Sequence, residues 1–189
     1  MINLKLKELL SKGFLSVFKL KFDQTTFQGK TLKNVQREVL YRNRPVVFLT
    51  LIDKVNKKAL FVKQVRPSAI LDDIQKPYVI ESIAGVVDEG QNPQEAAIRE
   101  AKEEANVDLK ISDLIVDGEG YLSPGISNEY AYFYHAYFDS SQYQTGCFGL
   151  EEEHEDIQTL LLDIKEINQL KDKVSVSTLM SLRVLEKYL

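Results

Sequence analysis

Residues 85–107, GVVDEGQNPQEAAIREAKEEANV, constrain this chain more than any other segment. A Gly-rich turn opens it and a helix is predicted to follow. Asn92 is a suitable N-cap, Pro93 suits the first helical position, and Glu95 completes a capping box. We expect the helix to end near Ala105.

This helix carries an unusual density of charge, with Arg99, Glu100, Glu103 and Glu104 within six residues. Glu100 and Glu104 are four positions apart, so they share one face. Like charges at these spacings destabilise an isolated helix, which indicates a purpose beyond folding. Carboxylates are ligands that Mg²⁺ prefers, and Mg²⁺ leaves positions open for water and phosphates. The apolar back of the helix is small: Ala97, Ala101 and Ala105.

Length and composition indicate one domain, with a small appendage at most. The 189 residues are 44% hydrophobic and carry a net charge of −4, which argues against a general nucleic-acid binder. Cys147 is the only cysteine, so an internal disulfide is excluded. The lysine-rich start does not look like a signal peptide, and no apolar run approaches the length of a membrane span. We therefore expect a cytoplasmic protein without membrane contact.

The remaining pattern predicts a mixed α+β fold with a largely antiparallel, twisted sheet packed between helices. A turn is expected between the first two strands and another over DKVNKK, and two C-terminal helices follow, KEINQLKD and VSTLMSLRVLEKYL. The strands are expected over 14–22, 35–41, 45–53, 59–65, 78–85, 115–122, 129–138 and 156–164.

The segment that starts at Gly85 resembles the signature of Nudix hydrolases: Gly, five residues, Glu, seven residues, Arg-Glu, an apolar residue, any residue, Glu-Glu, any residue, Gly and an apolar residue. Two positions depart from it. Asn106 replaces the closing Gly, and Asn tolerates the left-handed conformation that ends helices. Gln91 replaces the first Glu and keeps hydrogen bonding without the charge.

Three further segments resemble the subgroup of ADP-ribose and nucleoside-diphosphate-sugar pyrophosphatases. They are ESIAGVVDEG, SPGISNE and EEEHEDIQTLLLDI. The resemblance implies an α/β/α sandwich over residues 45–189 and a small β-rich extension over residues 1–44. In the subgroup this extension dimerises, so a homodimer is expected.

The resemblance also assigns roles within the site. Glu100 and Glu104 are implied as catalytic metal ligands, joined by Glu103 and the Ala84 carbonyl. Arg99, Gly85 and Gln91 are implied as structural support, with Arg99 pairing with Glu103. Arg66 and Glu129 are implied as substrate-binding residues.

The acidic run 151–156 is by default a solvated loop. The resemblance makes Glu153 the expected general base and Glu155 the second choice, as a metal ligand, although the choice among these acids stays open. His154 is expected at the surface and His135 packed within a strand. Cys147 has no histidine partner that the sequence can place.

The expected activity is Mg²⁺-dependent hydrolysis of ADP-ribose or a related nucleoside-diphosphate sugar, with Mn²⁺ as a possible substitute. The products are a nucleoside monophosphate and a sugar phosphate. The alternatives are a UDP- or GDP-sugar preference, or a weakened module that binds nucleotides. Gln91 keeps the last alternative open, whereas the three retained glutamates argue against it.

Overall fold

The computed structural model describes residues 1–167 and 174–188 and divides the chain into two compact units. The first unit comprises residues 1–45 and 120–130, and the second comprises residues 46–119 and 131–189. The sequence did not indicate that the segment 120–130 belongs with the N-terminal strands.

The first unit is built on a three-stranded antiparallel sheet of β1 (Ile2–Lys12), β2 (Ser16–Thr25) and β3 (Thr31–Tyr41). The prediction was wrong in omitting a strand before residue 14. It was also wrong in assigning all of 22–32 to a turn, because β2 and β3 extend into that segment.

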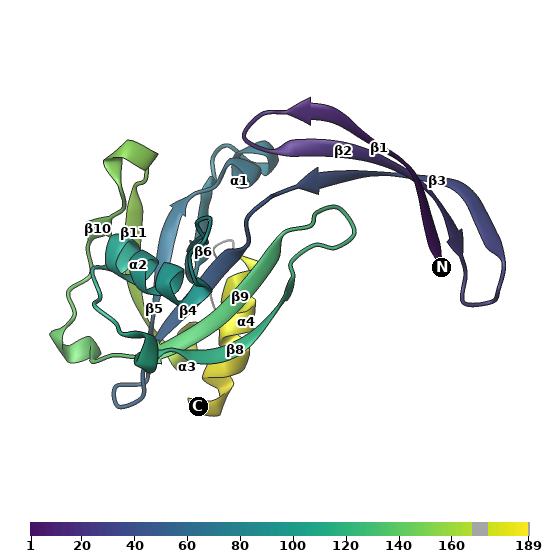
Figure 1. Cartoon of the computed structure of the whole chain (residues 1–189). Coiled ribbons are helices and arrows are strands. Elements are labelled where there is room, and N and C mark those ends of the chain that lie inside the picture. Colours follow the sequence, from purple (N-terminus) through teal and green to yellow (C-terminus); the bar gives the residue numbers. More distant parts are fainter. Residues whose placement is uncertain (168–173, 189) are drawn as a thin grey trace. The chain divides into compact units, whose positions relative to one another are not determined.

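The second unit contains an eight-stranded mixed sheet of order β10-β11-β5-β4-β9-β8, with β6 added to β5 and β7 added to β4 (Figure 1). β4 and β9 pair in parallel. β4 pairs antiparallel with β5 and β7, and β5 pairs antiparallel with β6 and β11. The strands are β4 (Val46–Asp53), β5 (Lys58–Val65), β6 (Tyr78–Glu81), β7 (Ile83–Val86), β8 (Ile115–Tyr121), β9 (Tyr130–Tyr137), β10 (Cys147–Phe148) and β11 (Ile157–Asp163).

One expected strand, 78–85, is two short strands in the structure, so this prediction was wrong. β6 pairs with β5, whereas β7 pairs with β4, and the chain changes partner at Ser82. The Ser82 side chain is buried and bonds to the Ser181 hydroxyl at 2.7 Å. This bond satisfies a polar group that would otherwise be costly to bury.

Helices cover both faces of the larger sheet. The helix α2 (Pro93–Ala105) packs against one face through its alanines, and α3 (Ile164–Ile167) and α4 (Val176–Leu185) pack against the other (Figure 1). A short helix α1 (Pro67–Asp72) follows β5, and a 3-10 turn (Glu186–Tyr188) follows α4. The predicted α+β sandwich is confirmed. The rest of the expected helix KEINQLKD lies outside the described residues, as does the last residue of the chain.

The predicted boundaries of α2 are confirmed. Asn92 Oδ1 accepts from the backbone N–H of Gln94 at 3.0 Å, and Asn92 N donates to Glu95 Oε2 at 3.2 Å. Asn106 ends the helix in the left-handed conformation, with φ 51° and ψ 37°. Both ends of the site-bearing helix are therefore fixed by local chemistry.

Candidate active site

Two carboxylates of α2 are buried rather than solvated. Glu100 is 7% exposed and Glu104 is 1% exposed, on a helix whose alanines enter the core. Burying a carboxylate is costly unless a charge or hydrogen bonds compensate it. The surroundings of the two groups therefore matter for function.

Glu104 is held against the strand that precedes the turn. Its Oε2 accepts from the backbone N–H of Ala84 at 3.0 Å. Burial raises the pKa of Glu104 well above its ordinary value. The Ala84 bond opposes this effect, and the neighbouring charges of Glu100 and Glu155 add to it.

Glu100 lies directly over the turn. A β-carbon built on Gly85 would lie 1.6 Å from Glu100 Oε1, so a larger residue at position 85 requires the Glu100 side chain to move. Burial raises the pKa of Glu100 to about 7, although the Arg99 guanidinium lowers it in part. The negative charge of Glu103 acts in the same direction as burial.

Arg99 joins the helix to the turn. Its guanidinium donates to Glu103 Oε2 at 2.6 Å and to the Val86 carbonyl at 3.0 Å, and it lies 2.8 Å from Glu100 Oε1. The structure thus contains the Arg99–Glu103 pair expected from the sequence, together with two contacts that spacing alone did not reveal. Arg99 can hold both glutamates in place.

Gln91 stabilises the turn in front of α2. Its Oε1 accepts from the backbone N–H of Asp88 at 3.1 Å, and its own N–H donates to the Asp88 carbonyl at 3.0 Å. The side-chain contact needs an acceptor oxygen at residue 91 but no negative charge, and the second contact is made by the backbone.

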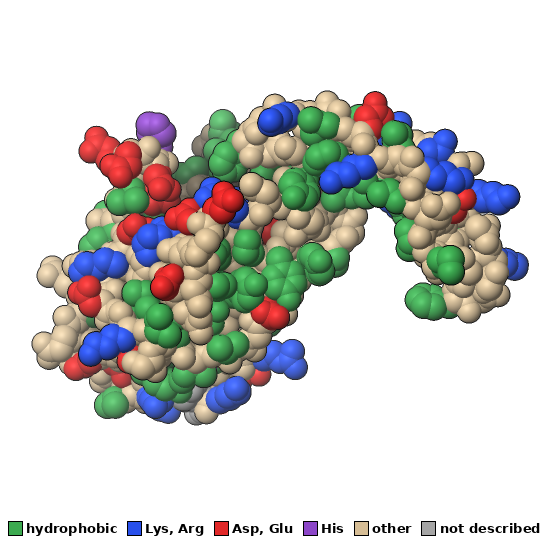
Figure 2. Space-filling view, viewed as in Figure 1, with side chains coloured by type: hydrophobic (Ala, Val, Ile, Leu, Met, Phe, Trp, Pro, Cys, Tyr) green, Lys and Arg blue, Asp and Glu red, His purple; other side chains and the backbone are tan. Residues whose placement is uncertain are grey.

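The acidic loop after β10 is attached to α2. The Gly149 N–H donates to the Glu103 carbonyl at 3.3 Å, and Glu155 Oε2 accepts from the Leu150 N–H at 3.2 Å. Figure 2 shows acidic side chains gathered on this part of the surface. Glu155 is the loop residue whose charge raises the pKa values of the two buried glutamates, whereas Glu153 lies exposed on a 3-10 turn (Glu151–Glu153).

Arg66 follows β5 and pairs with Glu81, a residue that the sequence reasoning did not assign to the site. Arg66 Nε donates to Glu81 Oε2, and Glu81 is 8% exposed. Burial raises the pKa of Glu81 and the Arg66 charge opposes that rise. The same Arg66 charge lowers the pKa of Glu104, which places it within electrostatic reach of the helix. The sequence feature that could have indicated Glu81 is its place as the first residue of the segment ESIAG.

Glu129 lies in the first unit, where Arg42 Nη1 donates to its Oε1. The other predicted site residues lie in the second unit. The structure therefore does not bring Glu129 into one compact unit with the glutamates of α2.

The two histidines and the cysteine do not belong to the group of residues around Glu100 and Glu104. His154 is exposed, as expected, and so is Cys147. His135 is buried in β9, with Nδ1 2.8 Å from Asp117 Oδ1. The expectation of a packed histidine is confirmed, but among the described residues its Nε2 has no hydrogen-bond partner.

Residues 42–180 match the sequence profile of the NUDIX domain. The chain belongs to the Nudix family. An ADP-ribose pyrophosphatase of Escherichia coli (strain K12) is 29% identical over 163 residues, covering 86% of this chain and 76% of the relative. One from Haemophilus influenzae is 30% identical over 154 residues, covering 80% and 69%. A GDP-mannose pyrophosphatase of Yersinia pestis is 30% identical over 147 residues, covering 77% and 71%.

Nudix hydrolases use a divalent metal ion, and the donor chemistry of this Nudix protein fits one. Glu100 and Glu104 offer buried oxygen ligands, and a cation would offset the burial that raises their pKa values. Among the described residues, no three His, Cys, Asp or Glu side chains already form a metal-ligand cluster.

None of the helices in the described part of the chain combines the length and apolar character required to cross a membrane.

Proposed function

We propose that this Nudix hydrolase cleaves the pyrophosphate bond of ADP-ribose or a related nucleoside-diphosphate sugar, with Mg²⁺ as its metal ion. The observation that carries the proposal is the buried pair Glu100 and Glu104 on the helix behind Gly85. The names of the relatives support the substrate class. The expected products are a nucleoside monophosphate and a sugar phosphate.

The charges of the site explain the need for a cation. The diphosphate is anionic, and so are the carboxylates of α2 and of the acidic loop. In our proposal Glu100, Glu104, Glu103, Glu155 and the Ala84 carbonyl are the candidate ligands. The bound metal supplies charge stabilisation for the phosphates and lowers the pKa of water. Arg99 holds Glu100 and Glu103 in orientation through its two ion pairs.

Hydrolysis requires a base for the attacking water. The water oxygen forms a bond to one phosphorus, the P–O bond to the bridging oxygen breaks, and the base accepts the proton. We assign this role to Glu153, whose exposed position on the loop leaves its carboxylate accessible. Glu155 is the alternative, since its charge already influences both buried glutamates.

Single substitutions separate the two loop residues. Glu153→Gln should lower kcat and leave Mn²⁺ affinity unchanged, because a base does not bind the metal. Glu155→Gln should weaken Mn²⁺ binding in calorimetry. If kcat survives Glu153→Gln, the base is another acid of the loop.

Arg66 is proposed to contact the substrate phosphates. Its ion pair with Glu81 fixes the guanidinium at the end of β5, within electrostatic reach of Glu104. A cation at this point favours an anionic substrate and reduces the repulsion from the helix. Glu129 is proposed to bind sugar hydroxyls, although its pair with Arg42 lies in the first unit.

A substrate panel tests the proposed activity. ADP-ribose, GDP-mannose and UDP-glucose are incubated with Mg²⁺, with Mn²⁺ and with chelator, and the products are separated by chromatography. We expect AMP and ribose 5-phosphate in equal amounts from ADP-ribose, and no turnover with chelator. GDP-mannose is the second candidate because a relative carries that name. If none of the three is hydrolysed with either metal, the chain is a nucleotide-binding module instead.

We also propose a homodimer formed through the N-terminal extension, residues 1–44. Cross-strand register places Leu4 beside Phe22, Leu9 beside Phe18, and Phe18 beside Val39, so one face of the small sheet is apolar. Leu4 and Leu9 are 55% and 48% exposed. An exposed apolar face of this kind is typical of a protein interface.

Charge supports a second copy as the partner. Residues 1–44 contain ten Lys or Arg and three Asp or Glu, whereas residues 45–189 contain 14 and 25. A basic extension of one copy therefore complements the acidic domain of another. The double variant Leu4→Lys/Leu9→Lys should be monomeric in light scattering after gel filtration, and Lys19→Gln should not change the mass. A wild-type monomer would contradict the proposal.

A further inference from the structure

A pocket lies on the side of the large sheet that faces away from α2. It has a volume of about 510 Å³ and lies between α4 and the strands β4, β8 and β9. Thr50 and Ser181 line it and bond to each other, which identifies this face as the one that α4 covers. The volume is in the range of small-molecule sites, about 300–1,000 Å³.

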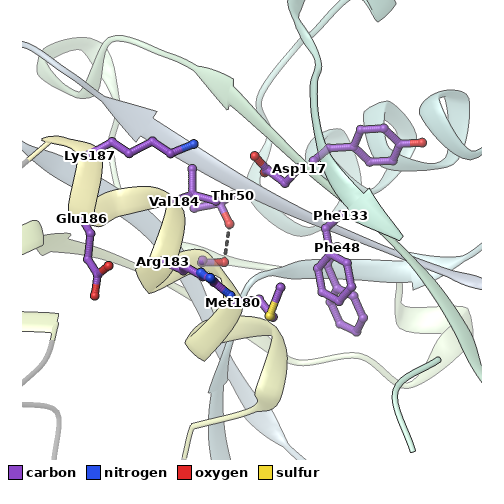
Figure 3. Close-up of a pocket in the computed structure, with 11 residues that line it drawn as sticks. Phe48, Thr50, Asp117, Phe133, Met180, Arg183, Val184, Glu186 and Lys187 are labelled. Carbon is purple, nitrogen blue, oxygen red and sulfur yellow. Dashed lines mark hydrogen bonds between the residues drawn. The ribbon is translucent and has the colours of Figure 1, made fainter. Parts of the chain in front are cut away.

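One wall of the pocket is aromatic. Phe48 of β4 and Phe133 of β9 are in register, and their rings stack at 5.3 Å with an interplanar angle of 18°. Met180 of α4 is 39% exposed and lies beside them (Figure 3). Such a wall offers an apolar surface against which a flat ring can pack.

The opposite wall carries positive charge. Arg183 and Lys187 line the pocket from α4 and the turn after it, and Figure 3 shows both side chains reaching toward the cavity. Within residues 1–167 and 174–188 neither has an ion-pair partner at salt-bridge distance. Two acids also line the pocket: Glu186 points away from it, and Asp117 is bonded to His135.

A polar atom beneath this face has no partner. His135 is in register with Thr50 across the parallel β4–β9 pair, so both side chains project from the same face of the sheet. His135 is 5% exposed, and its Nε2 makes no hydrogen bond among the described residues. Buried polar atoms without a partner are rare in proteins, so this nitrogen is available to a hydrogen-bonding group that reaches this face.

We propose that this pocket binds a small flat aromatic molecule with one anionic group. The ring packs on Phe48 and Phe133, and the anionic group lies between Arg183 and Lys187. This chemistry is common to aromatic carboxylates and nucleoside monophosphates. The site is separate from the diphosphate site and does not depend on the proposed hydrolysis.

Ligand-observed fluorine NMR with 4-(trifluoromethyl)benzoate tests the proposal. We expect the ¹⁹F line of the benzoate to broaden on binding and the line of the neutral 4-(trifluoromethyl)benzamide to broaden much less. Because hydrogen bonds to charged groups are strong, Arg183→Gln/Lys187→Gln should weaken benzoate binding about tenfold or more. Lys165→Gln, an exposed lysine on α3, is the matched control and should bind as the wild type does.

Two further measurements locate the site and the natural ligand class. Glu104→Gln should leave benzoate binding unchanged, because Glu104 lies on α2, on the opposite face of the sheet from the pocket. AMP that displaces the benzoate identifies nucleoside monophosphates as ligands, and failure to displace it assigns the pocket to carboxylates. Equal broadening of the benzamide, or unchanged binding in Arg183→Gln/Lys187→Gln, overturns the proposal, as does no broadening by the wild type.

Discussion

The carboxylate of Glu100 occupies the space where a side chain on Gly85 would lie, with Oε1 1.6 Å from the position of an added β-carbon. Fifteen positions separate the two residues in the sequence, yet each determines what the other can be. The φ angle of Gly85 is not in the left-handed region, so this glycine is needed for space rather than for backbone conformation.

Gly85→Ala should therefore displace Glu100 and impair catalysis. The added methyl group cannot fit unless the carboxylate moves, and a misplacement of about 1 Å commonly costs a factor of about 100 in rate. We expect kcat/KM for ADP-ribose to fall by about that factor, with weaker Mn²⁺ binding in calorimetry. The control is Gly120→Ala, where an added β-carbon meets no atom within 4 Å. Wild-type kinetics in Gly85→Ala would show that Glu100 does not need its position.

The sequence was most informative where structure is local. The start of α2 at Pro93 and its end at Ala105 depend on side chains within a few residues, and both were predicted correctly. The strand 78–85 was not, because its division at Ser82 depends on pairing with two different strands far along the chain. Local pattern carries no information about that change of partner.

Other features were missed for different physical reasons. Ile2, Leu4 and Leu6 alternate with polar residues, so the sequence of β1 does carry the pattern of a strand. Arg66, which follows β5, and Glu81 of β6 are 15 positions apart in the sequence, and the burial that raises the pKa of Glu81 is a property of the folded chain. The motif could indicate glutamates at the site, but not which of them would be buried.

Glu104→Gln should separate catalysis from stability. The amide oxygen can still accept from the Ala84 N–H, but the charge needed for a metal ligand is lost. We expect kcat to fall by about 100-fold or more, because even the outer-shell partners of metal ligands contribute about 10- to 100-fold. The melting temperature without metal should stay equal or rise, because a buried charge is removed. The control Glu166→Gln alters an exposed residue of α3. Near-normal kcat would place the metal elsewhere.

Gln91→Glu should leave turnover equal or raise it. The substitution restores the family residue and keeps an oxygen that can accept from the Asp88 N–H. A negative charge just before α2 also interacts favourably with the helix N-terminus. Steady-state kinetics with ADP-ribose at several Mg²⁺ concentrations provides the measurement. A clear loss of kcat would mean that the amide group of Gln91 has a role of its own.

Asp53→Asn should reduce stability in a pH-dependent manner. Asp53 is buried and accepts from Ser140 Oγ at 2.6 Å and from the N–H groups of Val55 and Asn56 at 2.8 Å. Burial alone would raise the pKa of Asp53, but these bonds outweigh it and hold the pKa below its ordinary value of 3.8. The stabilisation is therefore complete above that value and is lost as the pH falls below it. In urea unfolding we expect Asp53→Asn to cost about 2 kcal/mol at pH 7 and less at pH 3. An equal cost at both pH values would show that the charge of Asp53 contributes nothing.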